Sequence, residues 1–126
     1  MDKTSATIVF ESLASGIRLD IFRLLVRKGP EGLVAGEIAG ALDIPPTNLS
    51  FHLKALTQAH LVTVEQEGRF QRYRANMPLM LDLIAYLTAE CCAGDPGQCA
   101  DVNAVLSRAK CVASPVPSNT RKKVKA

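Results

Sequence analysis

The fold is decided by one stretch of sequence, which reads Ala41-Leu-Asp-Ile-Pro-Pro-Thr-Asn-Leu-Ser-Phe-His-Leu-Lys-Ala-Leu56. Near its start, Asp43-Ile-Pro-Pro46 is a turn, because a proline disfavours helical backbone at the residue before it. Beyond the turn, three leucines recur at helical spacing: Leu49, Leu53 and Leu56. This spacing predicts a helix over residues 47–59 with one buried stripe, and it leaves the remaining side chains facing solvent.

Apolar periodicity predicts further helices on both sides of this stretch. A first helix is expected over residues 5–14. A dense apolar helix starts at Ile17 and is stopped by Lys28-Gly29-Pro30, and a short helix follows from Val34 to Leu42. A last helix is expected from Met77 to about Cys92, where glycine and proline end it.

Two short runs after the central helix alternate apolar and polar residues. They span Leu61–Glu65 and Arg69–Tyr73, and Gly68 lies between them, so they predict a two-stranded hairpin. The fold class is therefore mainly α with a small β-hairpin, which is the winged helix-turn-helix arrangement. We expect residues 1–93 to form this domain, and residues 94–126 to form a cysteine-containing turn and a basic, largely disordered tail.

The second helix of a helix-turn-helix lies in the major groove and presents its N-terminal residues to the base edges. Here the candidates for DNA contact on that helix are small polar, aromatic and basic side chains: Thr47, Asn48, Ser50, Phe51 and Lys54. An exposed Phe51 suits the methyl group of thymine. The hairpin tip adds three candidates for phosphate or minor-groove contact: Arg69, Gln71 and Arg72.

Simpler interpretations of these residues stay open. Phe51 can cap the local core, and the hairpin residues can form a solvated charge cluster. Winged helices also serve as protein-binding modules, so topology alone does not establish DNA binding. His52 in the central helix and His60 before the first strand are expected to pack or orient neighbours rather than to bind metal.

The sequence resembles the ArsR/SmtB metalloregulatory repressors in the run from Ala41 to Leu56, in His60-Leu-Val-Thr-Val64 and in Gly68-Arg-Phe-Gln-Arg-Tyr-Arg74. The resemblance covers roughly residues 8–92 and is most specific in the second half of the first run. It implies a homodimer through the first and last helices, with operator double-stranded DNA as the partner. It also implies DNA-contacting positions at Thr47, Ser50 and Phe51.

Two metal-binding motifs known in this family are absent from this sequence. Many of its arsenic sensors carry a Cys-Val-Cys-Asp type motif on the helix before the recognition helix, but that region here reads Leu33-Val-Ala-Gly-Glu-Ile38. Its zinc sensors place Asp/His and His/Glu pairs on the last helix, which here holds Asp82 and Glu90 and no histidine. What remains is Cys91-Cys-Ala-Gly-Asp-Pro-Gly-Gln-Cys99, which is similar to the ending of one arsenic-responsive branch.

Three thiols within nine residues indicate a soft ion. Adjacent residues of a helix point apart, so Cys91 and Cys92 converge only where Gly94 and Pro96 break the helix. As(III) prefers a pyramid of three thiolates, whereas tetrahedral Zn²⁺ requires a fourth ligand. We therefore expect Cys91, Cys92 and Cys99 to bind As(III) as an inducer, with no organic cofactor.

Other uses of these cysteines stay open. The ion can be Sb(III), and the chain can be a Cd or Zn sensor or a thiol-redox repressor with a Cys92–Cys99 or Cys99–Cys111 disulfide. A bridge between Cys91 and Cys92 is disfavoured, because their Cα atoms are only about 3.8 Å apart across a trans peptide bond. An enzyme is not expected, since none of the four cysteines is followed six residues later by the arginine of a Cys-x₅-Arg phosphate loop.

The net charge of +3 is unevenly distributed. Residues 1–107 hold nine Lys or Arg and twelve Asp or Glu, whereas residues 108–126 hold six Lys or Arg and no acid. The tail is expected to be solvated or to contact phosphates without sequence preference. No apolar run approaches the ~18 residues of a membrane span, and no signal peptide is visible, so we expect a cytoplasmic protein.

Deleting residues 114–126 removes Arg121, Lys122, Lys123 and Lys125 and no acid. We expect lower affinity for random-sequence DNA, chiefly at low salt where phosphate attraction is least screened. Sequence preference and the response to As(III) should stay unchanged, and Cys111→Ser should respond normally. Fluorescence anisotropy over a salt series measures the first effect; equal low-salt affinities of the deleted and full chains would contradict it.

Overall fold

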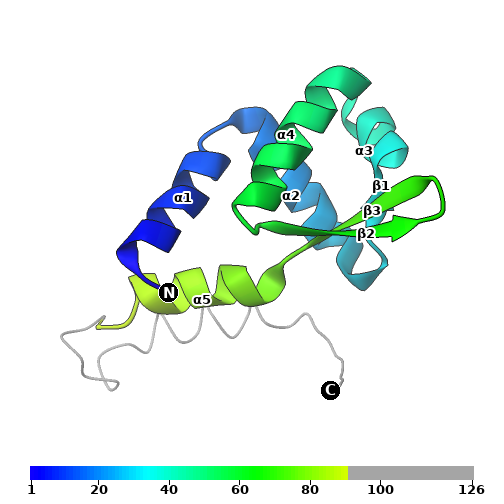
Figure 1. Ribbon diagram of the computed structural model, residues 1–126. Coiled ribbons are helices and arrows are strands. Elements are labelled where there is room, and N and C mark those ends of the chain that lie inside the picture. Colours follow the sequence, from blue (N-terminus) through cyan, green and yellow to red (C-terminus); the bar gives the residue numbers. More distant parts are fainter. Residues whose placement is uncertain (91–126) are drawn as a thin grey trace. The chain divides into compact units, whose positions relative to one another are not determined.

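Five α-helices and a small sheet make up the part of the chain that the computed structural model describes, residues 1–90 (Figure 1). The elements follow one another as α1 (Lys3–Leu13), α2 (Gly16–Lys28), the 3₁₀ turn η1 (Gly29–Glu31), β1 (Leu33–Val34), α3 (Ala35–Leu42), α4 (Pro46–Gln58), β2 (Val62–Glu67), β3 (Phe70–Ala75) and α5 (Met77–Leu87). None of the helices within residues 1–90 is long and apolar enough to cross a membrane.

Local residues fix the ends of the first two helices. The Asp2 carboxylate accepts a hydrogen bond from the backbone N–H of Ser5 at 2.8 Å, and this bond lowers the pKa of Asp2. The Ser15 hydroxyl accepts one from the N–H of Arg18 at 3.4 Å, so both helices begin at a side-chain cap. Gly29 ends α2 at φ +67°, a conformation that disfavours residues with a side chain.

The core lies between α2, α3, α4 and one face of the sheet. The leucine stripe expected on the central helix is confirmed, since all three leucines of α4 are buried. They belong to one cluster with other buried side chains, among them Ile21, Leu25, Ile38, Leu61, Val62, Tyr73 and Leu83. Burying one such aliphatic side chain contributes about 1.5–3 kcal/mol, so this cluster decides which side of α4 faces inward.

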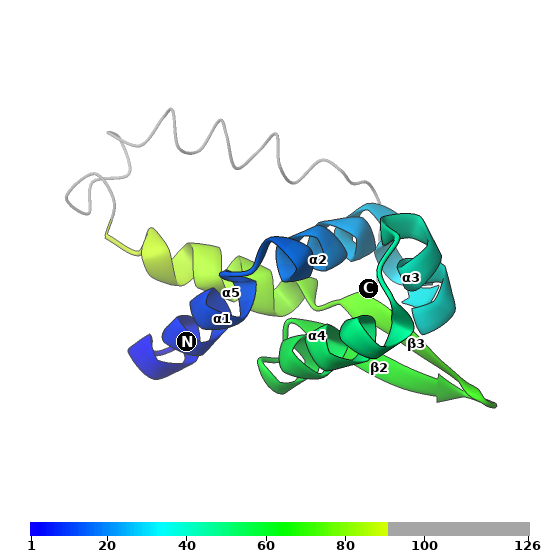
Figure 2. The same ribbon diagram turned by 90° about the horizontal axis from the view of Figure 1, so that it is seen from above.

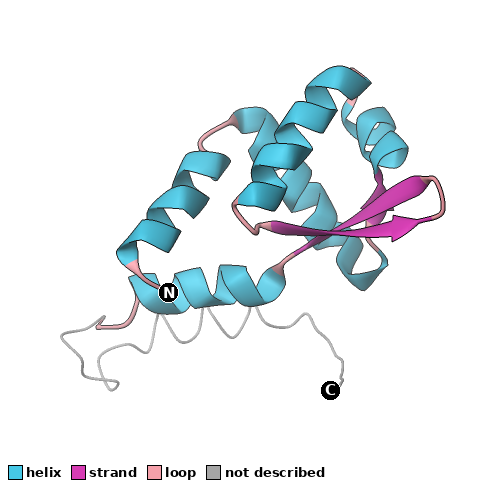
Figure 3. Cartoon of the chain, in the orientation of Figure 1, coloured by secondary structure: helices cyan, strands magenta, loops and turns pink. Residues whose placement is uncertain are grey.

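The sheet has three strands, not the two expected from the sequence (Figure 3). β1 pairs antiparallel with β3, with Leu33 opposite Tyr73, and the strand order is β1-β3-β2. Two residues are too few to show alternation, so the sequence pattern does not reveal β1. Gly32, at φ +64°, leads the chain into this strand with its backbone close to that of Tyr73.

The hairpin and the last helix also differ from the expected boundaries. Glu67 pairs with Phe70, so the strands are longer than expected and the turn is the two-residue loop Gly68–Arg69. Gly68 has φ +61°, which suits the first position of a type II′ turn. α5 ends at Leu87 instead of Cys92, and its last turn is exposed, so packing within this unit does not support a longer helix.

Both views place the hairpin tip on the side of this unit opposite α1 (Figures 1 and 2). The strands leave the core as they approach the tip, because Val62 is the only buried residue of β2 and Tyr73 the only one of β3. The outer half of the hairpin is therefore exposed to solvent on both faces. The expected domain boundary at residue 93 and all four cysteines lie outside the described residues.

Replacing Gly32 by alanine should destabilise the fold, because the new Cβ would collide with the carbonyl oxygen of Tyr73 at an unfavourable φ. We expect the free energy of unfolding to fall by more than the roughly 1–3 kcal/mol that backbone strain alone would cost. Gly29→Ala isolates that strain, since its φ is similar but no atom lies within 4 Å of the new Cβ. Urea unfolding compares the two variants; equal losses would contradict the close approach at Gly32.

Candidate nucleic-acid interface

The surface of α4 outside the leucine stripe is exposed, and the five candidates for DNA contact on this helix all lie on it: Thr47, Asn48, Ser50, Phe51 and Lys54. Phe51 has 67% of its surface exposed, so it does not cap the core. This face combines hydroxyl and amide groups, one aromatic ring and one ammonium group. Such groups can hydrogen-bond base edges and phosphates, contact a thymine methyl and neutralise a phosphate.

The N-terminus of α4 is open toward solvent. Pro45 precedes the helix and Pro46 is its first residue, and no side chain within residues 1–90 caps the amide groups of the first turn. The free amide groups of a helix N-terminus carry a partial positive charge and bind phosphate oxygens. Thr47 and Asn48 stand in the same turn, and both side chains are exposed beside these amide groups.

Arg18 connects α4 to the first helix. Its Nε donates to the carbonyl oxygen of Ser12 at 2.8 Å, and a terminal nitrogen lies 3.5 Å from Nδ1 of His52. The His52 ring in turn meets Phe51 edge-to-face, with 5.6 Å between the ring centroids. His52 therefore contacts both Arg18 and Phe51, and its orienting role stays a prediction. The sequence analysis did not include Arg18 among the site residues, because Arg18 affects the exposed face of α4 only through its contact with His52.

The hairpin tip carries Arg69 and Phe70. Within residues 1–90, the Arg69 side chain takes part in no hydrogen bond or ion pair, so its guanidinium is available to a phosphate. Phe70, at the closing position of the loop, is 58% exposed. The sequence analysis missed Phe70, although an aromatic residue two positions after a hairpin glycine is a visible signal.

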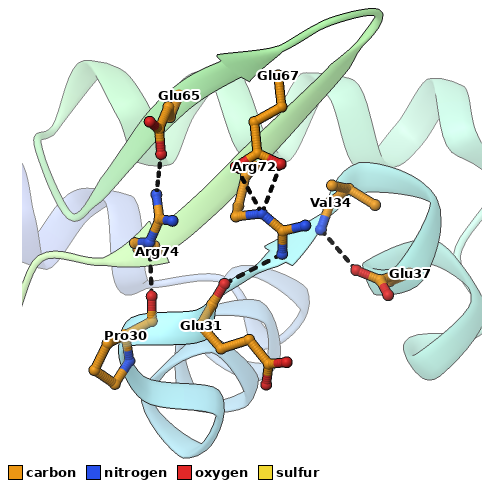
Figure 4. A network of polar contacts seen from close by, with 8 residues as sticks. All are labelled: Pro30, Glu31, Val34, Glu37, Glu65, Glu67, Arg72 and Arg74. Atoms are coloured by element: carbon orange, nitrogen blue, oxygen red, sulfur yellow. Dashed lines mark hydrogen bonds and ion pairs between the residues drawn. The ribbon is translucent and has the colours of Figure 1, made fainter.

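The other two hairpin candidates lie on β3, one and two residues after Phe70 and not at the tip itself, and their contact with DNA stays a prediction. Gln71 is hydrogen-bonded to Gln66 at 3.3 Å and accepts a hydrogen bond from the Tyr73 hydroxyl at 3.0 Å. Arg72 pairs with Glu67, and the hydrogen bond between them raises the pKa of Arg72 (Figure 4). Arg72 is displaced from the tip because the hairpin closes at Glu67 and Phe70, two residues before it on β3.

The expected thiolate site falls on residues that the structure does not describe. Cys91, Cys92 and Cys99, as well as Cys111, all come after Glu90. Within the described range, no group of three or more His, Cys, Asp or Glu side chains is placed to hold a metal ion. The two histidines of the chain, both in this range, are therefore not part of such a group.

Comparison with known proteins places this geometry in a family. A model of a helix-turn-helix domain family matches residues 13–65. The transcriptional repressor SdpR of Bacillus subtilis is 32% identical over 79 residues, which are 63% of this chain and 84% of SdpR. The putative arsenical resistance operon repressor ArsR of Halobacterium salinarum is 35% identical over 69 residues, and the match spans 55% of this chain and 53% of that protein.

A solved structure shares the architecture. The homodimeric winged helix-turn-helix DNA-binding domain Mb0332 of Mycobacterium bovis, a possible ArsR-family transcriptional regulator, is 28% identical with a TM-score of 0.55. The match covers 74% of this chain and 86% of that domain. The similarity to SdpR over most of its length, together with this shared fold, fixes the family. The chain belongs to the ArsR family of DNA-binding helix-turn-helix transcriptional regulators.

Proposed function

We propose that this chain is a homodimeric repressor that binds operator DNA through α4 and the hairpin tip, and that As(III) bound to Cys91, Cys92 and Cys99 releases it. The observation that carries the DNA-binding part is the exposed face of α4, which presents the five expected side chains around a largely exposed Phe51. The arsenic-binding part is supported by the cysteine pattern of the sequence.

On DNA, the first two turns of α4 would lie in the major groove. Asn48 and Ser50 suit hydrogen bonds to base edges or phosphates, and Phe51 suits a thymine methyl. Lys54 would neutralise a phosphate from the same face of the helix. Arg69 would reach the backbone or the minor groove from the tip of the hairpin, where it has no competing partner within residues 1–90.

A second copy of the chain would cover the apolar surfaces of the first and last helices. α1 exposes Ile8 and Phe10, at 46% and 47%, and α5 exposes Leu81 and Leu87, each at 58%. Several large apolar side chains exposed on α1 and α5 are typical of a surface that another protein covers. The Mycobacterium bovis relative is a homodimer, which supports the same assembly here. A symmetric dimer would read two half-sites about one helical turn apart.

Three thiolates suit As(III) chemically. Each As–S bond replaces one As–O bond of arsenous acid, so three thiols take up the ion with release of three waters and no transfer of electrons. Soft thiolate ligands select soft ions, and Cys91, Cys92 and Cys99 stand within nine residues. The halobacterial relative is named as a putative arsenical resistance operon repressor, and this name supports an arsenic compound as the signal for this chain.

Release would follow from linkage between two binding sites. The three cysteines follow α5, which we place in the dimer surface. An ion that binds the DNA-free dimer more tightly than the DNA-bound dimer weakens DNA binding by the same factor. The proposed structural step is a change in the spacing of the two α4 helices when the segment after α5 closes around the ion.

Phe51→Ala and Ser50→Ala should weaken binding to a duplex selected from random sequence with the unaltered chain. We expect the affinity to fall about fivefold or more for each lost base contact, which corresponds to roughly 1–3 kcal/mol. The thermal unfolding midpoint should hardly change, because both side chains are exposed. Gln58→Ala, exposed at the far end of α4, is the matched control and should bind normally. Unchanged affinity in both test variants would refute the proposed contact surface.

Cys91→Ser, Cys92→Ser and Cys99→Ser should each leave DNA binding intact and abolish or strongly weaken release by As(III). Fluorescence anisotropy of the protein–DNA complex during As(III) titration measures this, and X-ray absorption counts the sulfur ligands. Full release of Cys92→Ser, or arsenic bound through oxygen or nitrogen, would contradict the three-thiolate site. Titration with Sb(III), Cd(II), Zn(II) and peroxide in parallel shows whether another soft ion or oxidation acts instead.

A further inference from the structure

Arg72 joins the hairpin to a distant turn of the chain (Figure 4). Its Nε donates to both carboxylate oxygens of Glu67 on β2, each at 3.0 Å. A terminal nitrogen of the same guanidinium donates to the backbone carbonyl of Glu31 at 3.2 Å. One planar group therefore holds a side chain of the neighbouring strand and the backbone of η1 at the same time.

Arg74 repeats this arrangement two residues further along β3. Its Nε donates to the backbone carbonyl of Pro30 at 2.8 Å, and a terminal nitrogen donates to Glu65 at 2.7 Å. Successive residues of a strand alternate between its faces, so Arg72 and Arg74 share one face of the sheet. Each reaches diagonally, past the residue opposite it, to the glutamate two positions nearer the tip.

These contacts restrain a part of the molecule that the core does not. Beyond Val62 and Tyr73 the hairpin buries no side chain, so apolar packing does not set its direction. The turn η1 directly follows α2; it begins at Gly29 and is followed by Gly32, and both glycines have positive φ. Through η1, the two arginines add side-chain contacts between the hairpin and the helical body to the backbone pairing of β3 with β1.

We propose that Arg72 and Arg74 are positioning residues that clasp the hairpin to η1 and thereby hold Arg69 where it meets DNA together with α4. This inference rests on the proposed DNA binding. Three arginines lie on the hairpin. Arg72 and Arg74 bind protein groups and orient the hairpin, whereas Arg69 has no partner within residues 1–90 and can bind a phosphate. The clasp adds little to overall stability, because ion pairs between exposed side chains are weak in water.

The clasp itself is tested in the free protein by amide hydrogen exchange. The double variant Arg72→Gln/Arg74→Gln should exchange faster across the hairpin, with α4 and the unfolding midpoint nearly unchanged. Arg23→Gln/Arg27→Gln makes the same change of charge on the exposed side of α2 and should leave the hairpin as it is. Hairpin exchange that is unaltered in the first variant would overturn the clasp.

The effect on DNA is tested by combining the clasp variant with Arg69→Ala on the selected duplex. The clasp variant and Arg69→Ala should each lower the affinity about fivefold at 0.15 M salt. This is the contribution of one phosphate contact, for which the logarithm of the binding constant falls with the logarithm of the salt concentration with a slope near −0.9. The combination should bind no more weakly than Arg69→Ala, because both changes remove one contact. Additive losses, about 25-fold together, would show that Arg72 and Arg74 contact DNA directly and would refute positioning.

Lysine at both positions separates charge from geometry. Arg72→Lys/Arg74→Lys keeps both charges but lacks the planar fork that bridges two acceptors. It should therefore behave like the glutamine variant, and affinity equal to that of the unaltered chain would overturn the clasp. If the unaltered chain selects no duplex, the proposed DNA binding fails, and hydrogen exchange still decides whether the two arginines orient the hairpin.

Discussion

Burial of the α4 leucine stripe against α2 and α3 is the constraint on which the rest of the structure depends. Leu49 and Leu53 are each 2% exposed and Leu56 is fully buried, so the rotation of α4 about its axis is fixed. Turning the helix by one residue, about 100°, would place Ser50 and Lys54 in the core. Burying a hydroxyl and an ammonium group without partners costs several kcal/mol, which no gain on the outer face offsets. The same leucines that stabilise the fold thus direct Phe51 and its polar neighbours outward.

The two halves of the candidate interface are held by different forces. Apolar burial holds α4, whereas the outer hairpin is held by hydrogen bonds and ion pairs at the surface. Segments with few buried contacts open at lower free energy than core helices, so the hairpin is the half that can adjust to a partner. Arg18 on α2 connects α4 with α1, because it contacts Ser12 near the end of α1 and His52 on α4. A change at the proposed dimer surface therefore has a direct physical route to α4.

The sequence was sufficient to predict the elements with strong periodicity. The helices, the leucine stripe and the exposed face of α4 follow from spacing alone, and the structure confirms them. It was not sufficient for β1, because two residues carry no alternation, nor for the hairpin register, which depends on Gly68 and on pairing across the strands. The position of Arg72 follows from that register, and its contact with the Glu31 carbonyl joins residues 41 positions apart. No local pattern reports such a contact.

The central claim is that a symmetric dimer presents two α4 helices to one face of duplex DNA. Hydroxyl-radical footprinting of the unaltered chain on its selected duplex tests this claim most directly. Two α4 helices in successive major grooves should give two protected half-sites in inverted orientation, with centres roughly 10 base pairs apart. A single protected patch without a symmetric counterpart, or uniform protection along the duplex at the salt concentration of the cell, would contradict it.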